Sequence, residues 1–150
     1  MKKKFMIFCY LFVTLLVSSE LIYGSDQEAV EKVIKGAYFN GAFNDLDTNA
    51  MEKGFHPDFA IFSANGNQLA KYPIADWIKA IENKKKDPDF DPKNAVMECK
   101  IANLDVTGGC AFAKVEIFKG DEHIYTDYLS LLKFDDGWKI VAKVYHSYQH

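Results

Sequence analysis

Two histidines in this chain occupy positions from which a ring nitrogen could move a proton. His56 follows Phe55 and precedes Pro57-Asp58 at the predicted end of a helix, whereas His146 lies in the last β-type run. Imidazole titrates near neutral pH and is the most frequent general acid or base in enzymes. The alternative for His56 is capping of the helix C-terminus, and for His146 it is a hydrogen-bonded core histidine. We favour these structural interpretations at both positions.

A ligand site would need His146 to act with its predicted neighbours. Tyr128 and Thr126 alternate along the preceding β-type run, so their side chains are expected on the same face of the sheet as His146. A His–Tyr pair in an apolar cup could polarise a carbonyl group or orient a ligand. The sequence holds no nucleophile elbow, phosphate-binding glycine loop, zinc-ligand spacing or EF-hand loop. The prediction therefore includes no catalytic residue, no metal and no cofactor.

The first residues carry the pattern of a secretory signal peptide. Lys2, Lys3 and Lys4 precede an uninterrupted apolar run over residues 5–17, and small and polar residues follow as far as Gly24. The apolar run is too short to span a bilayer comfortably, although an uncleaved N-terminal anchor is the alternative. With residues 1–24 as the signal peptide, residues 25–150 form one domain that is exported to the periplasm or the extracellular space, free of the membrane.

Composition excludes some functions for residues 25–150. The sequence contains no arginine, and without the three lysines and one glutamate of residues 1–24 its formal net charge of −3 becomes −5. A mildly acidic protein without the side chain that binds phosphates and bases in a bidentate manner is unsuited to nucleic acid. Cys99 and Cys110 fall on successive predicted strands at a separation too large for a disulfide, so both are expected as free, buried thiols.

Hydrophobic spacing predicts three helices followed by a sheet. The first helix begins at a Ser25-Asp-Gln-Glu28 capping box, the second begins near Asp47, and the third takes Pro73 as its first residue. Strands are expected over residues 59–62, 96–106, 110–119, 123–134 and 138–148. This order is typical of an α+β domain in which the helices pack on one antiparallel sheet.

The last hairpin sets the register of its two strands. Asp135-Asp136-Gly137 separates two β-type runs, and a three-residue turn with Gly137 in the left-handed region would pair Phe134 with Trp138. A two-residue turn at Asp136-Gly137 is the alternative, but it would set lysines opposite apolar residues. We therefore expect the three-residue turn.

The preceding hairpin turns at Gly120-Asp121. A two-residue loop there pairs Lys119 with Glu122. If alternation then continues unbroken, Val115 lies opposite Thr126, and one face of the sheet collects Thr126, Tyr128, Ser130, Ala142 and His146.

That face, predicted to lie under the helices, has small residues at its centre. Such a centre leaves either room for a helix to approach closely or an unfilled cavity, and the sequence does not separate the two. The cavity interpretation predicts a ligand pocket between the helices and the sheet. Its candidate residues are Tyr38, Met51, His56, Phe62, Trp77, Ala113, Thr126, Tyr128, Ser130, Ala142 and His146.

The opposite face mixes apolar residues with a charged cluster of Lys114, Asp127 and Lys143. A solvated face would not need so many apolar side chains, so a homodimer surface is expected there. The charged cluster is then a structural ion network, with a catalytic role for Asp127 as the alternative. The residues predicted at the dimer surface are Phe112, Leu129, Leu131, Val141 and Tyr145.

Three segments resemble the nuclear-transport-factor-2-like superfamily, and within it the "putative lumazine-binding" group related to the SnoaL-like proteins. They are Phe55-His56-Pro57-Asp58, Tyr128-Leu129-Ser130-Leu131 and the final Leu-Leu-Lys-Phe-Asp-Asp-Gly-Trp138-Lys-Ile140-Val-Ala-Lys143-Val. The resemblance implies an α+β cone in which three N-terminal helices pack on a curved antiparallel sheet, with a pocket between them and dimerisation through the sheet.

The superfamily includes isomerases, dehydratases and non-catalytic binding proteins, and its catalytic members use Asp, Tyr or His inside the cone. The predicted inner face offers Tyr128 and His146 but places Asp127 outside. Our leading hypothesis is therefore an exported, dimeric protein that binds a small, partly apolar molecule. The first alternative is a lyase or isomerase with His146 or His56 as base and Tyr128 as electrophilic partner. The second is a non-catalytic dimerisation or partner-binding module.

Overall fold

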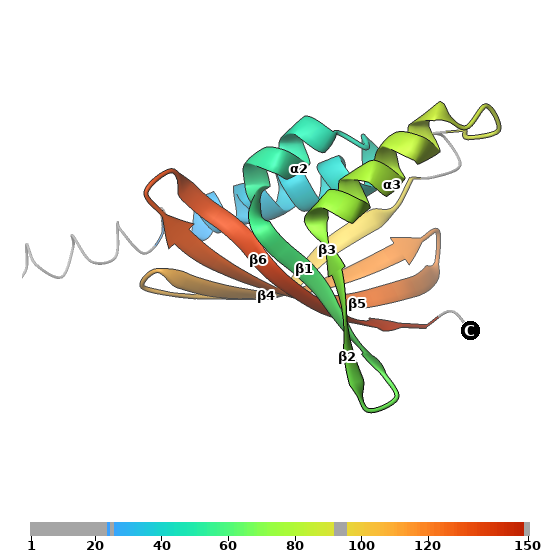
Figure 1. Ribbon diagram of the computed structural model, residues 1–150. Helices are drawn as coiled ribbons and strands as arrows, with labels where there is room; N and C mark the ends of the chain where they lie inside the picture. Colours follow the sequence, from blue (N-terminus) through green and yellow to red (C-terminus); the bar gives the residue numbers. More distant parts are fainter. Residues whose placement is uncertain (1–23, 25, 92–95, 149–150) are drawn as a thin grey trace, which may run out of the picture.

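The computed structural model describes residues 24, 26–91 and 96–148, so the predicted signal segment and the Ser25 cap lie outside the described residues. Helical residues 26–33 run directly into a π-helix, and the remaining elements follow in the order helix, hairpin, helix and four strands (Figure 1). Their bounds are η1 Ile34–Asn44, α2 Thr48–Gly54, β1 Phe55–Asn65, β2 Gln68–Pro73, α3 Ile74–Lys86, β3 Glu98–Thr107, β4 Cys110–Lys119, β5 Glu122–Phe134 and β6 Gly137–Ser147.

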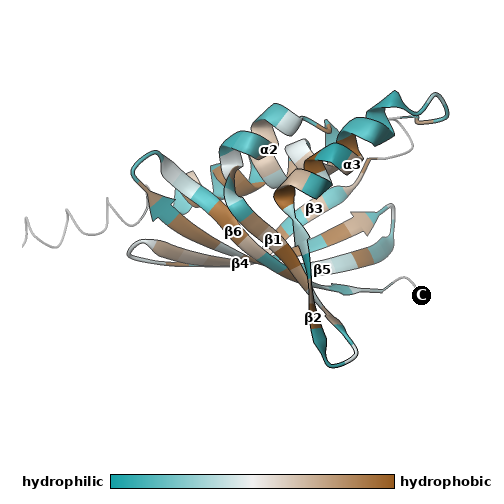
Figure 2. Ribbon diagram, in the orientation of Figure 1, coloured by the Kyte–Doolittle hydropathy of each residue, from teal (hydrophilic) through white to brown (hydrophobic). Residues whose placement is uncertain are grey.

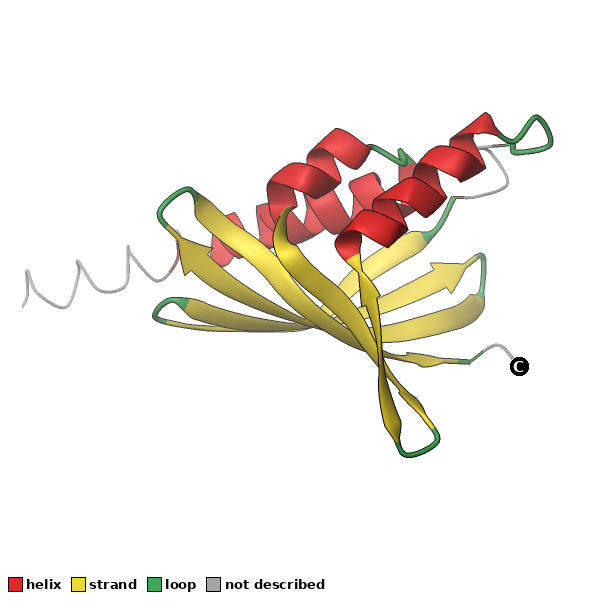
Figure 3. Ribbon diagram, viewed as in Figure 1, coloured by secondary structure: helices red, strands yellow, loops and turns green. Residues whose placement is uncertain are grey.

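The strands form one six-stranded sheet in the order β2-β1-β6-β5-β4-β3. All neighbours are antiparallel except β1 and β6, which pair in parallel. The sheet curves around the helices, which all lie on one side of it (Figure 3). The predicted α+β architecture of three helices on a curved sheet is confirmed, with one parallel pair and a strand, β2, that the sequence did not predict.

Local sequence explains where the helices begin and how they pack. The Asp47 side chain accepts hydrogen bonds from the backbone N–H groups of Asn49 and Ala50, which caps α2. Pro73 is the extended N-cap of α3 rather than its first residue. Gly54 at the end of α2 touches η1 so closely that a Cβ there would stand 2.2 Å from the Cβ of Ala37. A glycine is therefore required at this crossing.

The π-helix η1 supplies three aromatic side chains to the interior, those of Tyr38, Phe39 and Phe43. Its wider turn carries hydrogen bonds from residue i+5 back to residue i, and one such bond ends it, from the Asp45 N–H to the Asn40 carbonyl at 2.7 Å. Tyr38 is fully buried, and its ring meets that of Phe43 edge to face at 5.3 Å. Departures from α-geometry of this kind occur frequently at functional sites.

Bulges overturn the predicted assignment of residues to the two faces. The turn pairing of Lys119 with Glu122 is confirmed, but β5 then carries Ile124 as an extra residue, so that Tyr125 lies opposite Ile117 and Asp127 opposite Val115. Every residue of β5 beyond the bulge is therefore on the opposite face from the one predicted. On β6 a second bulge leaves Val141 without a partner on β5. Ile140 and Lys143, which pair with Leu131 and Leu129, therefore both lie on the inner face.

The last turn also differs from both predicted forms. Phe134 pairs with Gly137, Lys133 with Trp138, and Leu131 with Ile140, so the turn consists of Asp135 and Asp136 alone. Gly137 has a φ of 117° and begins β6, a conformation that L side chains rarely adopt. Lys133 and the Trp138 indole both donate hydrogen bonds to Asp26, at 2.7 and 3.2 Å, which ties the first helical segment to this hairpin.

The inner face of the sheet and the helices share one hydrophobic core. Figure 2 shows apolar stretches along the strands and polar residues on the turns and the exposed side of α3. Leu129 and Leu131, predicted at the dimer surface, lie in this core with exposures of 0% and 1% because of the bulge in β5. The core includes Val30, Ile34, Ala37, Tyr38, Met51, Phe55, Phe59, Ala113, Val115, Ile117, Leu129, Leu131 and Ile140.

Two further features concern the cysteines and the length of the apolar helices. Cys99 and Cys110 are both free thiols, as predicted, but Cys99 is only half-buried and Cys110 is exposed, so the predicted burial was wrong. Across residues 24, 26–91 and 96–148, no helix combines the length and the apolar character needed to cross a membrane.

Candidate functional site

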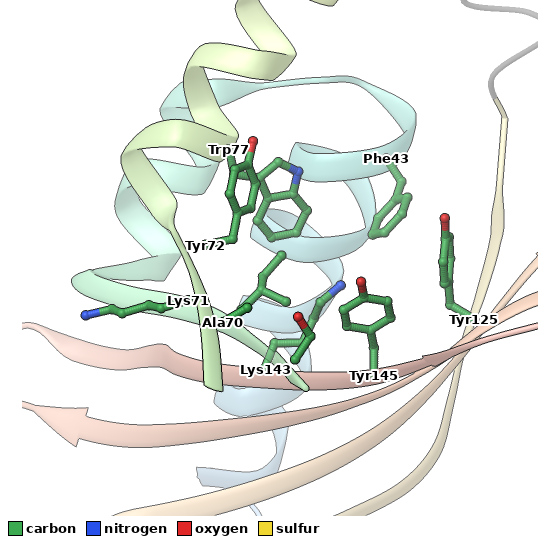
Figure 4. Close-up of a pocket in the computed structure, with 10 residues that line it drawn as sticks. Phe43, Ala70, Lys71, Tyr72, Trp77, Tyr125, Lys143 and Tyr145 are labelled. Atoms are coloured by element: carbon green, nitrogen blue, oxygen red, sulfur yellow. The ribbon is translucent and has the colours of Figure 1, made fainter. Parts of the chain in front are cut away.

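An open cavity of about 520 Å³ lies between η1, α3, the β1–β2 hairpin, the start of β5 at Tyr125 and the end of β6 at Tyr145. Figure 4 shows aromatic rings around it, with Trp77 and Tyr72 on one side and Phe43, Tyr125 and Tyr145 on the other. This mixture of apolar walls and a few polar groups is characteristic of small-molecule sites. The lining residues are Phe43, Ile61, Ser63, Ala70, Lys71, Tyr72, Trp77, Tyr125, Lys143 and Tyr145.

Three polar side chains meet at the inner end of this cavity. Tyr38 donates a hydrogen bond to Oδ2 of Asp127, and the Lys143 amine donates to the Tyr38 hydroxyl at 3.2 Å and to the same Asp127 oxygen at 3.3 Å. Asp127 and Tyr38 are 0% exposed, and Lys143 is 6% exposed. We call these three residues the buried triad; Lys143 is the member that reaches the cavity lining.

Burial shifts the pKa of two members of the triad, Lys143 and Tyr38. Desolvation lowers the pKa of the Lys143 ammonium, and the charge of Asp127 opposes this change. Desolvation raises the pKa of Tyr38 well above 10.0, and the adjacent Asp127 adds to the effect. The phenol therefore stays protonated at neutral pH and donates to the carboxylate, and the lowered pKa enlarges the neutral fraction of the Lys143 amine.

Aromatic rings enclose the Lys143 amine. Its Nζ lies 5.2 Å from the centre of the Trp77 ring, 5.1 Å from that of Tyr145 and 5.5 Å from that of Tyr38. Ring faces stabilise the cationic form of a nitrogen at this place, and so would stabilise a cation formed from it. Asp127 Oδ1 is buried and has no hydrogen-bond partner among the described residues, which leaves one strong acceptor unused beside the amine.

The structure places only part of the predicted pocket at this cavity. Trp77 lines it, and Tyr38 lies directly behind the lining, hydrogen-bonded to Lys143. Met51 and Ala113 are fully buried in the core. The small residues at the sheet centre, represented by Ala113, are covered by the packed helices, so at that point the close-packing alternative is correct.

Most of the other predicted pocket residues lie on the outer face of the sheet. Ser130 pairs with Ala142, and Thr126 pairs with His146, all displaced outward by the bulges at Ile124 and Val141. The predicted inner face was therefore wrong for this set, and none of its members lines the cavity. The set consists of Phe62, Thr126, Tyr128, Ser130, Ala142 and His146.

Neither histidine considered as a base faces the cavity. The His56 ring is stacked on Phe134 with centroids 4.8 Å apart, and its Nδ1 accepts a hydrogen bond from the Asp58 N–H at 3.1 Å. His56 belongs to β1, so it does not cap α2 either. His146 is exposed and contacts the Tyr148 ring edge to face. Thr126 hydrogen-bonds to His123 and Tyr148 rather than to a ligand site.

The residues that sequence reasoning missed include those that the bulges turn inward and those of β2, a strand that was not predicted. Asp127, Lys143 and Tyr145 were predicted outside, yet Asp127 pairs with Tyr145 on the inner face and Lys143 pairs with Leu129. Of the predicted charged cluster, Asp127 and Lys143 do form an ion pair, but Lys114 pairs instead with Glu116 at 3.1 Å. The sequence did contain a signal for this pair. Asp127 and Lys143 carry opposite charges within strongly apolar strands, and charges that are buried in such strands must be paired.

Within the described part of the chain, no three His, Cys, Asp or Glu side chains come together in a way that could hold a metal ion. The polar groups that face the cavity are the Lys143 amine and the hydroxyls of Ser63 and three tyrosines, whereas the Lys71 side chain points away from it (Figure 4). They can donate hydrogen bonds to a ligand oxygen, and Lys143 can also react as a nucleophile when neutral.

Comparison with known proteins gives a family match over most of the chain. The family model described as "putative lumazine-binding" matches residues 25–146. An aldolase, FrzH, from a Cladobotryum species is 27% identical over 120 residues, which cover 79% of this chain and 90% of that protein.

Solved structures share the fold. A protein of unknown function from Shewanella baltica, described as similar to nuclear transport factor 2, is 26% identical with a TM-score of 0.67 over 85% of this chain and 98% of that one. A protein of the same description from Methylobacillus flagellatus is 29% identical with a TM-score of 0.62, over 83% and 94% of the two chains.

Proposed function

Because this chain belongs to the "putative lumazine-binding" family of the nuclear-transport-factor-2-like superfamily, we propose that its cavity binds a small, partly apolar molecule. The observation that supports the proposal is the cavity of about 520 Å³, in which aromatic walls surround one buried amine, that of Lys143. A volume of this size is within the range of sites that enclose small ligands. The family label itself is not taken as the identity of the ligand.

The lining indicates the chemistry of the ligand. Phe43, Ile61 and Trp77 provide apolar contact, whereas the Lys143 amine and the Tyr145 hydroxyl are donors at the inner end (Figure 4). A ligand that fits this distribution has a ring or short aliphatic body and an oxygen acceptor at one end, such as a carbonyl or carboxylate group.

Tryptophan fluorescence tests this binding. The sequence has two tryptophans, and the Trp138→Phe variant leaves Trp77 of the cavity as the only one. Titration with cyclohexanone, benzaldehyde, benzoate and lumazine should change Trp77 emission saturably for at least one compound. The matched Trp77→Phe variant, which keeps Trp138 near Asp26, should show no saturable change. Unchanged Trp77 emission with all four compounds would count against the proposed pocket.

A second candidate function is that of a lyase or isomerase acting on a carbonyl compound in the same cavity. Two observations favour it: the buried triad brings an amine, a carboxylate and a phenol together, and the relative from Cladobotryum is named an aldolase. Such an enzyme removes a proton from the carbon next to the carbonyl.

Isotope exchange tests this candidate. The protein should exchange the α-hydrogens of cyclohexanone for deuterium in D2O, followed by NMR, and the Asp127→Asn variant should be slower by about 10²-fold or more, as expected when a catalytic base is lost. The same exchange rate in the buffer without protein would reject the activity while leaving ligand binding in place.

The outer sheet face is the proposed homodimer surface. Phe112, Tyr128 and Val144 point outward there with exposures of 40%, 39% and 50%, and the first two rings are stacked with centroids 5.9 Å apart. An exposed apolar patch on a sheet face supports self-association through a two-fold interface. This set replaces Leu129 and Leu131 of the predicted interface, which are core residues.

Export is proposed from the sequence of residues 1–24. Lys2, Lys3 and Lys4 and the apolar run that follows have the features of a cleavable secretory signal. When the whole chain is expressed in a bacterial host, the mass of the product recovered from the periplasm or medium should correspond to a chain that begins at Ser25. Recovery of the full-length chain from the cytoplasm alone would reject the proposal.

A further inference from the structure

Lys143 has the environment of a reactive amine rather than that of a surface cation. Its side chain is 8% exposed, and Figure 4 shows its nitrogen directed into the space between Trp77, Phe43 and Tyr145. Exposed lysines are almost entirely protonated at neutral pH and therefore attack carbonyl carbon only slowly. A lysine that is desolvated in an apolar pocket has a larger neutral fraction and serves as a nucleophile in proteins.

The groups that stabilise the Lys143 ammonium would also stabilise a protonated imine, in which the positively charged nitrogen is double-bonded to carbon. Asp127 Oδ2 lies 3.3 Å from Nζ, and the rings of Trp77 and Tyr145 have their centres 5.2 and 5.1 Å away. A carboxylate and aromatic faces stabilise positive charge whether the nitrogen belongs to an ammonium or to a protonated imine. The Tyr38 hydroxyl, 3.2 Å from Nζ, already accepts a hydrogen bond from this nitrogen.

From this geometry we infer that Lys143 forms a Schiff base with an aldehyde or ketone bound in the cavity. The inference rests on the proposed function and narrows its ligand to a carbonyl compound. The walls formed by Phe43, Ile61 and Trp77 select an uncharged carbonyl compound with an apolar body.

The reaction balances without any further reagent. The lone pair of the neutral amine attacks the carbonyl carbon, a C–N bond forms, and the carbonyl oxygen takes up a proton as one N–H proton is lost. The C–O bond of this carbinolamine then breaks, and the oxygen leaves as water when it takes a second proton, the one that the lysine ammonium released to become the neutral amine. The product is a protonated imine beside Asp127, and its charge replaces that of the lysine ammonium.

Reductive trapping tests the inference on the intact domain. The protein is incubated with benzaldehyde and sodium cyanoborohydride at neutral pH, which converts an imine into a stable secondary amine, and the site of the adduct is mapped by peptide mass spectrometry. We expect most of the adduct at Lys143, because desolvation lowers the pKa of its ammonium and the cavity holds the aldehyde beside its amine.

Two variants provide the comparison. Lys143→Arg keeps a positive charge beside Asp127 but has no amine that can condense, so the preferred adduct should disappear. Lys139→Arg changes a lysine of the same strand that is paired with Asp136 outside the cavity, and it should leave the Lys143 adduct in place. The mapping on the wild-type protein does not depend on whether Lys143→Arg folds.

The possible results separate the two proposals. Adduct concentrated on Lys143 supports the Schiff base. Saturable quenching of Trp77 by benzaldehyde with no preferred adduct at Lys143 overturns the Schiff base and leaves the binding pocket in place. Adduct spread evenly over the exposed lysines, with no effect on Trp77, overturns the inference together with benzaldehyde binding.

Discussion

At the scale of single residues, the three side chains of the buried triad depend on one another, because each is hydrogen-bonded to the other two. Asp127 is fully buried, and its stability as a carboxylate depends on the donors Tyr38 and Lys143. Removal of one member of a buried ion pair costs far more than removal of an exposed one, because the remaining charge is left without compensation. The triad therefore carries stability as well as the proposed chemistry.

Substitution of Asp127 by Asn should expose this dependence. The amide keeps the size of the side chain but leaves the Lys143 ammonium without its counter-charge, so the free energy of unfolding should fall by about 3 kcal/mol. Asp121→Asn in the exposed turn between β4 and β5 is the matched control, with an expected change within about 0.5 kcal/mol. Urea unfolding of both variants gives the comparison, and equal midpoints would show that the pair is not held as described.

Tyr38→Phe tests the raised pKa of the phenol. At neutral pH the variant should be less stable by about 2 kcal/mol, since a hydrogen bond to a charged group is lost. The pKa of Tyr38 in the folded protein lies well above 10.0, so above pH 10 the unfolded chain loses a proton that the folded chain retains. The stability advantage of the wild type is therefore complete below pH 10 and declines as the pH rises further.

The measurement is urea unfolding of both proteins at about pH 8 and about pH 11. The Cys99 thiol, whose pKa burial raises to about 12, is present in both proteins, so its contribution cancels in the difference. Tyr128→Phe on the outer face is the control. A constant difference between wild type and Tyr38→Phe at both pH values would contradict the assignment.

At the scale of the elements, the contact between η1 and α2 has no room for a side chain at Gly54. A methyl group there would overlap Ala37, so Gly54→Ala should lower the free energy of unfolding by about 1–3 kcal/mol, the usual cost of overpacking. Gly36→Ala in η1 adds the same methyl group where nothing lies within 4 Å, and it should not destabilise. Thermal unfolding distinguishes them, and equal melting temperatures would rule out the tight crossing.

The strands also show why the face assignment failed. On β4, Ala111, Ala113, Val115 and Ile117 form one wholly apolar set, whereas the other set holds Lys114 and Glu116, so the inner face was predicted correctly. On β5, by contrast, Tyr125, Leu129 and Leu131 form one alternating set, and Tyr128 and Leu132 belong to the other.

Both alternating sets of β5 residues include apolar side chains, so the hydrophobic pattern of the sequence could not show that Ile124 is an extra residue. The position of a bulge is fixed by the curvature that the sheet needs in three dimensions rather than by a local propensity. The three helices and the hairpins between β3, β4, β5 and β6 could be predicted from periodicity and turn residues, and the family from the resemblance of three segments. The site could not, because one inserted residue decides whether Asp127 faces inward.

At the scale of the whole molecule, the outer sheet face and the cavity lie on opposite sides of the sheet. Self-association through Phe112, Tyr128 and Val144 would therefore leave the cavity open to ligand. The two proposals are independent, and each can fail without the other.

Val144→Lys should convert a dimer into a monomer, because the exposed valine would be replaced by a charge at the centre of the interface. Leu69→Lys on the β1–β2 hairpin, where Leu69 is 73% exposed, is the control and should leave the dimer intact. Light scattering coupled to size-exclusion chromatography gives the mass. If the wild-type protein is monomeric at high concentration, the proposed dimer is rejected and the proposal of a ligand-binding cavity is unaffected.

The position of β6 has a consequence for how the protein acquires its structure. This strand, which carries Lys143, is the last one in the chain, yet it lies in the middle of the sheet and is the strand through which the β1–β2 hairpin joins the others. Contacts between segments so distant in sequence form slowly, since a long loop must first close. During synthesis, β1 therefore has no partner other than β2 until translation has reached β6. A chain that passes unfolded through a translocon would complete its sheet only after its final strand has emerged.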